Sequence, residues 1–332
     1  MSQKSTPPVH PVLVANPTAS GHDRARALLQ QQARTAQWPP IREIPTTPHD
    51  FGAAMTRQAL AEGADLVIVG GGDGTVRTVA GELAGTGVSL AVLPLGTANI
   101  FARNLGLRPH RIAQAVEVAV HGNTRTIDLG QVHLDGDDHP QPFLVMAGVG
   151  HDADTIDQLS PGLKKTLGWP AYLEAGIRHL WDGPITMTVS ADGGPAEQGK
   201  YWSLLLGNAS SIPSGLKVFP DARLDDGGLS LLAVSAPALH RWVQVAASLV
   251  HRRLGGRAIH RRRVAWAELL LDDATLVQVD GDVHGPARRM RVDLSPAALA
   301  VRAPQPPRRV LSRRDPQIPQ ARTRKDSHDQ AQ

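Results

Sequence analysis

The chain has 332 residues, of which 41% are hydrophobic and 20% charged, a composition typical of a folded protein large enough for two hydrophobic cores. It contains no cysteine, which excludes disulfides and thiolate metal sites and favours a reducing compartment, so we expect a cytoplasmic protein. No apolar stretch approaches the roughly 18 residues that span a bilayer, and the short polar start, residues 1–8, has no signal-peptide apolar region.

The positive charge of the chain is concentrated near its C-terminus. The formal net charge is +4, but residues 302–332 alone hold eight Lys and Arg against three Asp, which leaves the remainder at −1. A body with so little net charge lacks the electrostatic footprint of a nucleic-acid-binding surface. We therefore expect no nucleic-acid partner, and a disordered basic tail over residues 304–332, where proline is frequent.

Strands and helices alternate in the first part of the chain. The pattern predicts strands at 9–15, 41–44, 66–69 and 89–93, and helices at 23–37, 50–62, 75–84 and around 101–105. This alternation predicts an open parallel sheet with helices on both faces. Binding sites in such sheets lie beyond the carboxyl ends of the strands.

The pattern changes after residue 121. Strands are predicted at 124–134, 143–149, 185–190, 202–206, 229–234 and 275–279, with helices at 164–180 and 237–253. The final strands, 290–294 and 299–301, can pack on either domain. We therefore predict an α/β plus β fold. An N-terminal open parallel α/β domain (9–126) faces a C-terminal antiparallel β-sandwich-like domain (127–303) across a cleft.

A glycine-rich turn, Gly-Gly-Gly-Asp-Gly-Thr over residues 70–75, follows the apolar strand 66–69. Glycines let the backbone approach a ligand closely, and the free N–H groups at a helix N-terminus favour phosphate. Asp73 would repel phosphate unless a cation intervened, which indicates Mg²⁺-nucleotide chemistry. The alternative is an ordinary tight turn in which Asp73 caps the following helix.

Two further polar turns follow neighbouring strands, at residues 16–21 and 96–99. Because the carboxyl ends of parallel strands meet at one edge of a sheet, these two turns and the glycine-rich turn can converge on one ligand.

Six motifs occur along the chain in a fixed order: Asn16-Pro17 with Gly21, Gly71 to Thr75, Pro94 to Asn99 with Phe101 to Arg103, Asp128 to Gly130, Leu224 to Gly227, and Asp280 to Asp282. Together they resemble the diacylglycerol kinase catalytic family over roughly residues 9–303, specifically its soluble bacterial, diacylglycerol- and sphingosine-kinase-like branch. NAD kinases and phosphofructokinases share the glycine-aspartate motif, whereas the ordered series is far more specific. The resemblance implies a kinase that uses ATP and Mg²⁺ to phosphorylate the hydroxyl of diacylglycerol or a related lipid alcohol.

The resemblance also implies roles for individual residues. Asp73 would act through the catalytic Mg²⁺, and Asp282 stands where the family usually has the glutamate thought to be the general base. The residues that would bind the nucleotide are Asn16, Pro17, Thr46 or Thr47, Gly71, Gly72, Asp73, Gly74, Thr75 and Thr97.

Asp226 resembles the family's structural-metal aspartate, with the backbone carbonyls of Arg223 and Gly228 as co-ligands. One carboxylate with carbonyls and water suits Mg²⁺. The alternative is a plain hairpin turn, for which Asp-Gly is a common signal.

Three residues depart from the family pattern. Asp282 is one methylene shorter than glutamate, so the backbone would compensate, Asp280 or a water would bridge, His284 would substitute, or activity would be reduced. Arg77 occupies a position where the family often has asparagine, and it either reaches a nucleotide phosphate or faces solvent. Ile100 stands where many members have Asp or Asn.

An apolar helix face at 237–253 is followed by a run of arginines that includes 261–263. This arrangement fits docking of a cytoplasmic enzyme on anionic lipid headgroups. The alternative is that the helix packs on the β-rich domain and the arginines are solvated.

Two other functions fit part of the sequence. A kinase for a soluble alcohol, of the NAD-kinase type, would share the glycine-rich turn but leaves the other motifs unexplained. A non-catalytic nucleotide and lipid sensor, or a weakly active enzyme, is supported by the shortened acid Asp282.

Overall fold

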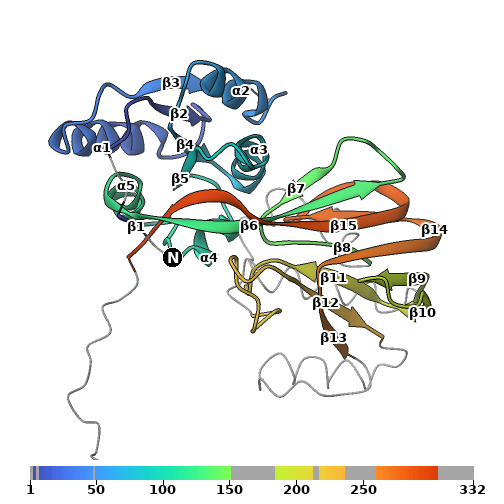
Figure 1. Ribbon diagram of the computed structural model, residues 1–332. Coiled ribbons are helices and arrows are strands. Elements are labelled where there is room, and N and C mark those ends of the chain that lie inside the picture. The colour runs from blue at the N-terminus through green and yellow to red at the C-terminus, as the bar shows by residue number, and fades with distance from the viewer. Residues whose placement is uncertain are drawn as a thin grey trace, which may run out of the picture.

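The computed structural model describes residues 3–4, 7–47, 49–150, 184–211, 217–235 and 259–305 (Figure 1). The helices predicted at 164–180 and 237–253, and the tail beyond residue 305, lie outside this range. Hydrogen bonds connect the strands of the described residues into one mixed sheet of 15 strands. The N-terminal part of this sheet is parallel and the remainder is antiparallel, which confirms the predicted fold class.

The N-terminal part follows the predicted alternation of strands and helices. Its strands pair in parallel in the order β3-β2-β4-β5. Helix α5 was missed by the sequence analysis, although its Val and Ala residues recur at helical spacing. The elements are β2 (Pro11–Ala15), α1 (His22–Thr35), β3 (Arg42–Pro45), α2 (Ala53–Ala61), β4 (Leu66–Gly71), α3 (Asp73–Leu83), β5 (Ser89–Pro94), α4 (Ile100–Asn104) and α5 (Ile112–His121).

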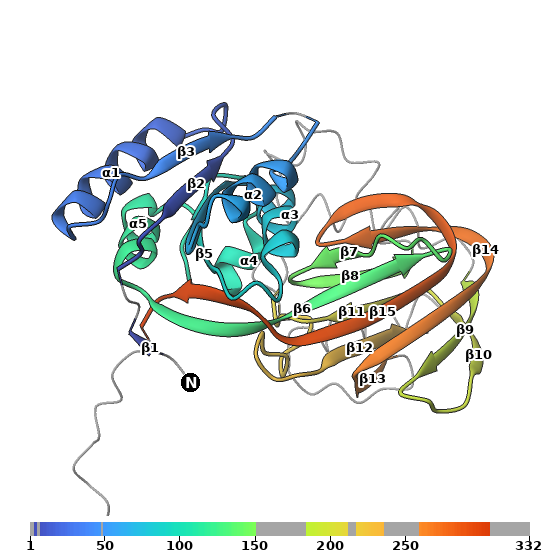
Figure 2. The same cartoon turned by 45° about the horizontal axis from the view of Figure 1, so that its top comes forward.

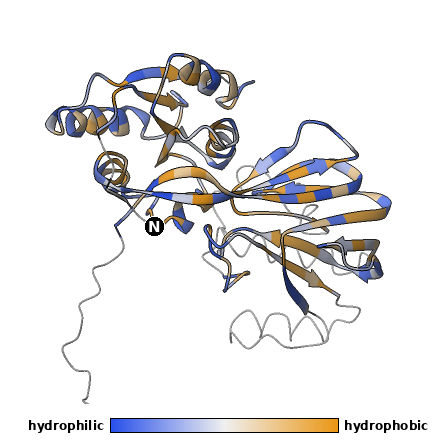
Figure 3. Ribbon diagram, in the orientation of Figure 1, coloured by the Kyte–Doolittle hydropathy of each residue, from blue (hydrophilic) through white to orange (hydrophobic). Residues whose placement is uncertain are grey.

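Both faces of the parallel sheet are buried, which explains why its central strands are almost continuously apolar. Successive side chains of a strand point to opposite faces. Leu13 and Ala15 of β2 therefore pack in the core that α1 and α5 cover, whereas Val12 and Val14 pack in the core that includes α2 and α3. The helices accordingly carry both hydrophilic and hydrophobic residues (Figure 3).

The remaining strands pair with one another in antiparallel fashion, around a core of their own that includes Phe143, Leu204 and Met290. They are β6 (Asn123–Leu134), β7 (Gln141–Phe143), β8 (Met146–Gly150), β9 (Ile185–Ala191), β10 (Glu197–Tyr201), β11 (Ser203–Gly207), β12 (Leu229–Val234), β13 (Ile259–Val264), β14 (Trp266–Val279) and β15 (Asp282–Ala303), with β1 (Gln3–Lys4) on the start of β6.

The long strands β6 and β15 run side by side through both parts of the molecule (Figure 2). The two strands predicted at 290–294 and 299–301 are one strand, interrupted between Ser295 and Leu299 by an irregularity at which Ala297 has a φ of 51°. Near its end, β15 also pairs in parallel with β5. The strand that begins with Asp282 thus belongs to the same hydrogen-bonded sheet as the strand that precedes the glycine-rich turn.

The antiparallel pairing of β6 with β7 depends on a glycine. Gly130 pairs with Phe143, and a Cβ at Gly130 would overlap the buried Phe143 ring. We expect Gly130→Ala to lower the free energy of unfolding by about 1–3 kcal/mol, the usual cost of overpacking, in urea denaturation. Gly285→Ala is the matched control, because nothing lies within 4 Å of its Cβ position. Equal losses in the two variants would contradict this account.

Candidate active site

The three polar turns at the ends of β2, β4 and β5 lie against one another through their backbones. The Asn16 N–H donates to the Gly70 carbonyl at 2.9 Å, and the Gly96 N–H donates to the Gly71 carbonyl at 3.1 Å. A Cβ at Gly96 would overlap the Cα of Gly72. Glycine is therefore required for the turns to meet, and their side chains and N–H groups share one edge of the sheet.

Threonines from two of the turns take different positions. Thr75 is buried, and its side chain folds back so closely that a Cβ at Gly71 would lie 2.8–2.9 Å from it. Thr97, in contrast, is exposed. Thr97 is therefore free to reach a ligand directly, whereas Thr75 shapes the glycine-rich turn.

The remaining residues predicted to bind nucleotide flank the end of β2. The Asn16 side chain accepts hydrogen bonds from the N–H and hydroxyl of Thr18, at 2.9 and 2.8 Å, while Pro17 is exposed. The Thr46 N–H donates to the carbonyl that ends β2, at 2.8 Å. The Thr47 hydroxyl accepts the Asp50 N–H at 3.1 Å, so it is engaged in the turn that leads to α2. Thr46 is thus bonded directly to the end of β2, whereas Thr47 belongs to the turn that follows.

Asp73 is the first residue of α3, yet its carboxylate is directed toward a neighbouring helix. The Ile100 N–H, at the start of α4, donates to Asp73 Oδ1 at 2.6 Å. In the part of the chain that the structure describes, no side chain caps the N-terminus of α3, so the alternative in which Asp73 caps its own helix is wrong. Ile100 contributes its backbone N–H, which every residue type except proline supplies, and its side chain is buried.

The environment of Asp73 disfavours its charged form. Burial raises the pKa of Asp73 from 3.8 to about 6, the Ile100 N–H opposes this rise, and the nearby charge of Asp280 adds to it. A carboxylate with such a raised pKa gains from a bound cation, because the cation offsets both the burial and the neighbouring negative charge.

Asp280 holds the turn between β14 and β15. It has a φ of 51° and is followed by Gly281 with a φ of 87°. Its buried carboxylate accepts the N–H groups of three consecutive residues at 2.8–3.0 Å: Leu144, Val145 and Met146. Both oxygens are therefore used inside the protein, and the hypothesis that Asp280 bridges to a substrate is wrong.

Asp282 lies beside the glycine-rich turn and is paired with Arg77 of α3. Its Oδ2 atom is 2.9 Å from Arg77 Nη2 and 3.4 Å from the position that a Cβ of Gly74 would take. Arg77 Nη1 donates to the Val279 carbonyl at 2.7 Å. The Arg77 side chain is only 11% exposed, which rules out the solvent-facing alternative, whereas the Asp282 side chain is 56% exposed. Two departures from the family pattern thus form one ion pair.

His284, the next residue but one, is half-buried rather than fully exposed. Its Nε2 atom is buried and has no hydrogen-bond partner in the part of the chain that the structure describes. Burial lowers the pKa of His284, and the charge of Arg77 lowers it further. The imidazole is therefore neutral at neutral pH and is a second basic group close to Asp282.

In the 223–228 turn, which the sequence predicts to be a metal site, the aspartate is bonded to an arginine. The Asp226 carboxylate accepts the N–H groups of Arg223 and Gly228 at 3.1 and 3.3 Å. The Arg263 guanidinium lies 3.2 and 3.1 Å from its two oxygens. As it stands, this carboxylate does not fit the role of a metal ligand, because a divalent ion would first have to displace the guanidinium. No group of three His, Cys, Asp or Glu residues suited to a metal occurs among the described residues.

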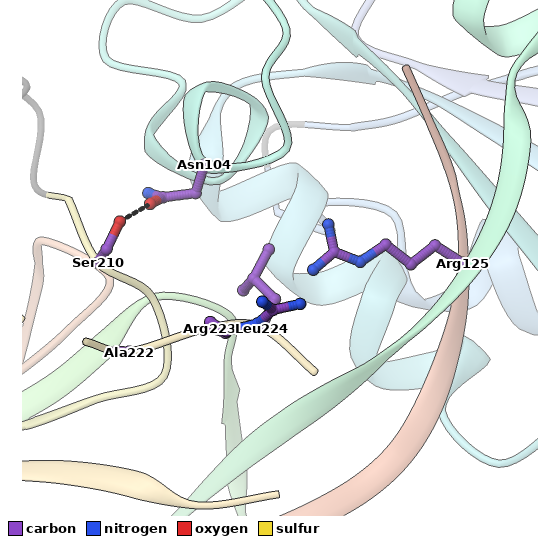
Figure 4. Close-up of a pocket in the computed structure, with 6 residues that line it drawn as sticks. All are labelled: Asn104, Arg125, Ser210, Ala222, Arg223 and Leu224. Atoms are coloured by element: carbon purple, nitrogen blue, oxygen red, sulfur yellow. Dashed lines mark hydrogen bonds between the residues drawn. The ribbon is translucent and has the colours of Figure 1, made fainter. Parts of the chain in front are cut away.

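A pocket of about 250 Å³ lies next to this turn (Figure 4). In it Arg125 of β6 reaches toward Leu224 and Arg223. Asp225 neutralises part of the charge, since it pairs with Arg125 at 3.0 Å and with Arg223 at 3.1 Å. No local sequence pattern identifies the pocket, because its lining comes from four separate segments of the chain. The lining residues are Asn104, Arg125, Ser210, Ala222, Arg223 and Leu224.

The raised pKa of Asp73 predicts a pH-dependent stability. Because the folded pKa of about 6 lies above the unfolded value, the native state binds the proton more tightly, and stability falls as pH rises from 4 to 8. A shift of this size corresponds to about 3 kcal/mol. We expect Asp73→Asn to be more stable than the wild type by only about 1 kcal/mol at pH 4.5, and by up to about 3 kcal/mol at pH 8, in urea denaturation without metal. The same difference at both pH values would contradict the assignment.

Comparison with known proteins places the chain in a family. The model of the diacylglycerol kinase catalytic domain matches residues 10–132. A Pseudomonas aeruginosa protein named "Probable lipid kinase YegS-like" is 33% identical over 301 residues, which cover 88% of this chain and 94% of that protein. A protein of the same name from Pseudomonas putida is 34% identical over 255 residues, or 75% of this chain and 81% of its own.

The fold has solved counterparts. The crystal structure of a diacylglycerol kinase from Bacillus anthracis str. Sterne matches with a TM-score of 0.66 at 20% identity, over 91% of this chain and 99% of that chain. Within the described residues, no helix has the length and apolarity needed to cross a membrane. On the sequence identity and the matched domain together, the chain belongs to the diacylglycerol kinase catalytic family and is a lipid kinase.

Proposed function

We propose that this kinase transfers the γ-phosphate of Mg²⁺-bound ATP to the hydroxyl of diacylglycerol or a related lipid alcohol. The observation that supports the proposal best is the position of Asp282, whose carboxylate lies against the glycine-rich turn although it comes from the far end of the chain. Phosphoryl transfer to an alcohol needs a phosphate cradle and a carboxylate next to each other.

The nucleotide phosphates lie on the 70–75 turn in this proposal. The turn offers backbone N–H groups and the N-terminus of α3, an 11-residue helix, and Thr97 and Asn16 stand at its sides. Asp73 suits Mg²⁺, because a carboxylate buried beside a second negative charge gains from a bound cation. When bound, Mg²⁺ neutralises the charge that develops on the phosphates.

Asp282 acts as the general base that takes the proton from the lipid hydroxyl. Its side chain is 56% exposed, so a substrate can reach it, while Arg77 fixes its direction. Neutral His284 is the alternative base. Because a lipid alcohol resides in a bilayer, the proposal includes contact with a membrane surface.

The arginine run that the sequence analysis assigned to membrane docking is partly engaged inside the protein. Arg261 donates to the Val218 carbonyl at 2.8 Å, and Arg263 bonds Asp226. The apolar helix face at 237–253 lies outside the described residues. Within the described part of the run, Arg262 is the arginine best placed for a headgroup, because Arg261 and Arg263 are already engaged.

The direct test is transfer of radiolabelled phosphate from ATP to a panel of lipid alcohols in mixed micelles. We expect the wild type to phosphorylate at least one lipid. Asp282→Asn should lower kcat by about 10²–10⁴ with little change in the KM for ATP, because general-base catalysis contributes that much. Asp273→Asn is the matched control, since its side chain is 96% exposed.

Other results would identify the competing functions. ATP binding without transfer to any lipid would indicate a sensor, and transfer to NAD would indicate a soluble-alcohol kinase. If His284→Ala, and not Asp282→Asn, removed the activity, the base would be the histidine.

The pairing of Arg77 with Asp282 predicts that the two residues act as a unit. If Arg77 works by positioning Asp282, removing it matters only while the carboxylate is present. We expect a double-mutant cycle of Arg77→Ala and Asp282→Asn, read in kcat, to be non-additive by about 0.5–3 kcal/mol. Additive losses would show that Arg77 acts elsewhere, for example on a nucleotide phosphate.

A further inference from the structure

We propose that the guanidinium of Arg263 takes the cation position of the 223–228 turn, so that this kinase holds the turn with its own side chain and needs no divalent metal there. The proposal concerns stability and stands apart from the proposed function. Three features support it: the contacts of Arg263, the space that its guanidinium occupies, and the charges around the turn.

Arg263 uses the oxygens that a hard cation would use. Its Nη1 atom is 3.2 Å from Asp226 Oδ2, its Nη2 atom is 3.1 Å from Oδ1, and Nη2 also donates to the Asp226 carbonyl. One guanidinium thus bonds three acceptors of a single residue. Carboxylate and carbonyl oxygens are also the ligands of Mg²⁺, and a planar guanidinium matches a carboxylate through two parallel bonds.

The fold provides a space for this side chain. A Cβ at Gly228 would collide with the Arg263 guanidinium, which lies where only glycine leaves room. The sheet register fixes the approach, because Arg263 of β13 pairs with Ser230 of β12, two residues after Gly228. The position of the guanidinium therefore follows from backbone pairing and glycine as well as from charge.

Burial of the carboxylate explains why a cation is needed at all. The Asp226 side chain is only 14% exposed, and a poorly solvated carboxylate must be paired. The turn is also fastened by two hydrogen bonds to Asp128, whose carboxylate accepts the Gly227 N–H and whose own N–H donates to the Leu224 carbonyl, each at 2.7 Å.

The charges around the turn already balance. Arg125 and Arg223 pair with Asp225, and Arg263 pairs with Asp226. Asp128 adds a third carboxylate, which accepts the Gly227 N–H. A divalent ion on Asp226 would add two positive charges in contact with Arg263, and like charges at that distance repel strongly.

The test is thermal unfolding of the full chain without nucleotide, in EDTA and in excess MgCl₂. We expect the wild type to have the same Tm in EDTA and in MgCl₂. Any rise in Tm that Mg²⁺ causes by binding at Asp73 is identified by the variant Asp73→Asn, which lacks it. Arg263→Ala should unfold at lower temperature in EDTA, by about 2–4 °C for each kcal/mol lost. Mg²⁺ should raise its Tm, and the additional change Asp226→Asn should abolish that rise.

Arg262→Ala is the matched control, because Arg262 directly precedes Arg263 in β13 and is exposed. This variant should leave the Tm and its response to Mg²⁺ unchanged. The proposal is overturned if Mg²⁺ raises the wild-type Tm and Asp226→Asn removes the rise, or if Arg263→Ala unfolds at the wild-type temperature in EDTA. Should Arg263→Ala not fold, Arg263→Lys replaces it, since lysine lacks the two parallel bonds; a wild-type Tm in EDTA would then overturn the proposal.

Discussion

Arg77 reaches from α3 to the turn between β14 and β15, where its guanidinium bonds the Val279 carbonyl and the Asp282 carboxylate. These contacts join residues about two hundred positions apart in the chain. They hold the candidate base against the loop that starts α3, which is where the phosphates would lie. The guanidinium is nearly buried, whereas the carboxylate is 56% exposed, so the arginine is held by the protein and the acid remains open to a substrate.

The rest of the site can be understood as support for this contact. Asp280 fixes the turn by accepting three N–H groups, and the end of β15 pairs with β5, so the turn and the glycine-rich loop belong to one sheet. Arg77 pairs with Asp282, and its charge opposes the raised pKa of the buried Asp280. Burial, together with the charge of Asp280, raises the pKa of Asp73 to about 6, so its carboxylate gains from a bound cation.

The sequence predicts much of this fold because its signals are local. Apolar runs, glycine turns and helix spacing identify β2, β4, β5 and α3 to within a few residues. The course of β15 is set instead by pairing with distant strands, which no local pattern reveals. The same holds for the partners of Arg77 and Asp226. Spacing places an arginine or an aspartate near a site, but which cation meets which carboxylate is decided in three dimensions.

The central claim is that ATP lies on the 70–75 turn with its terminal phosphate toward Asp282. A crystal structure with Mg²⁺ and a non-hydrolysable ATP analogue tests it most directly. The account predicts the β- and γ-phosphates on the N–H groups of the glycine-rich turn, the metal on the side of Asp73, and Asp282 facing the γ-phosphate. A nucleotide bound elsewhere, for instance in the arginine-lined pocket beside residues 223–225, would contradict it.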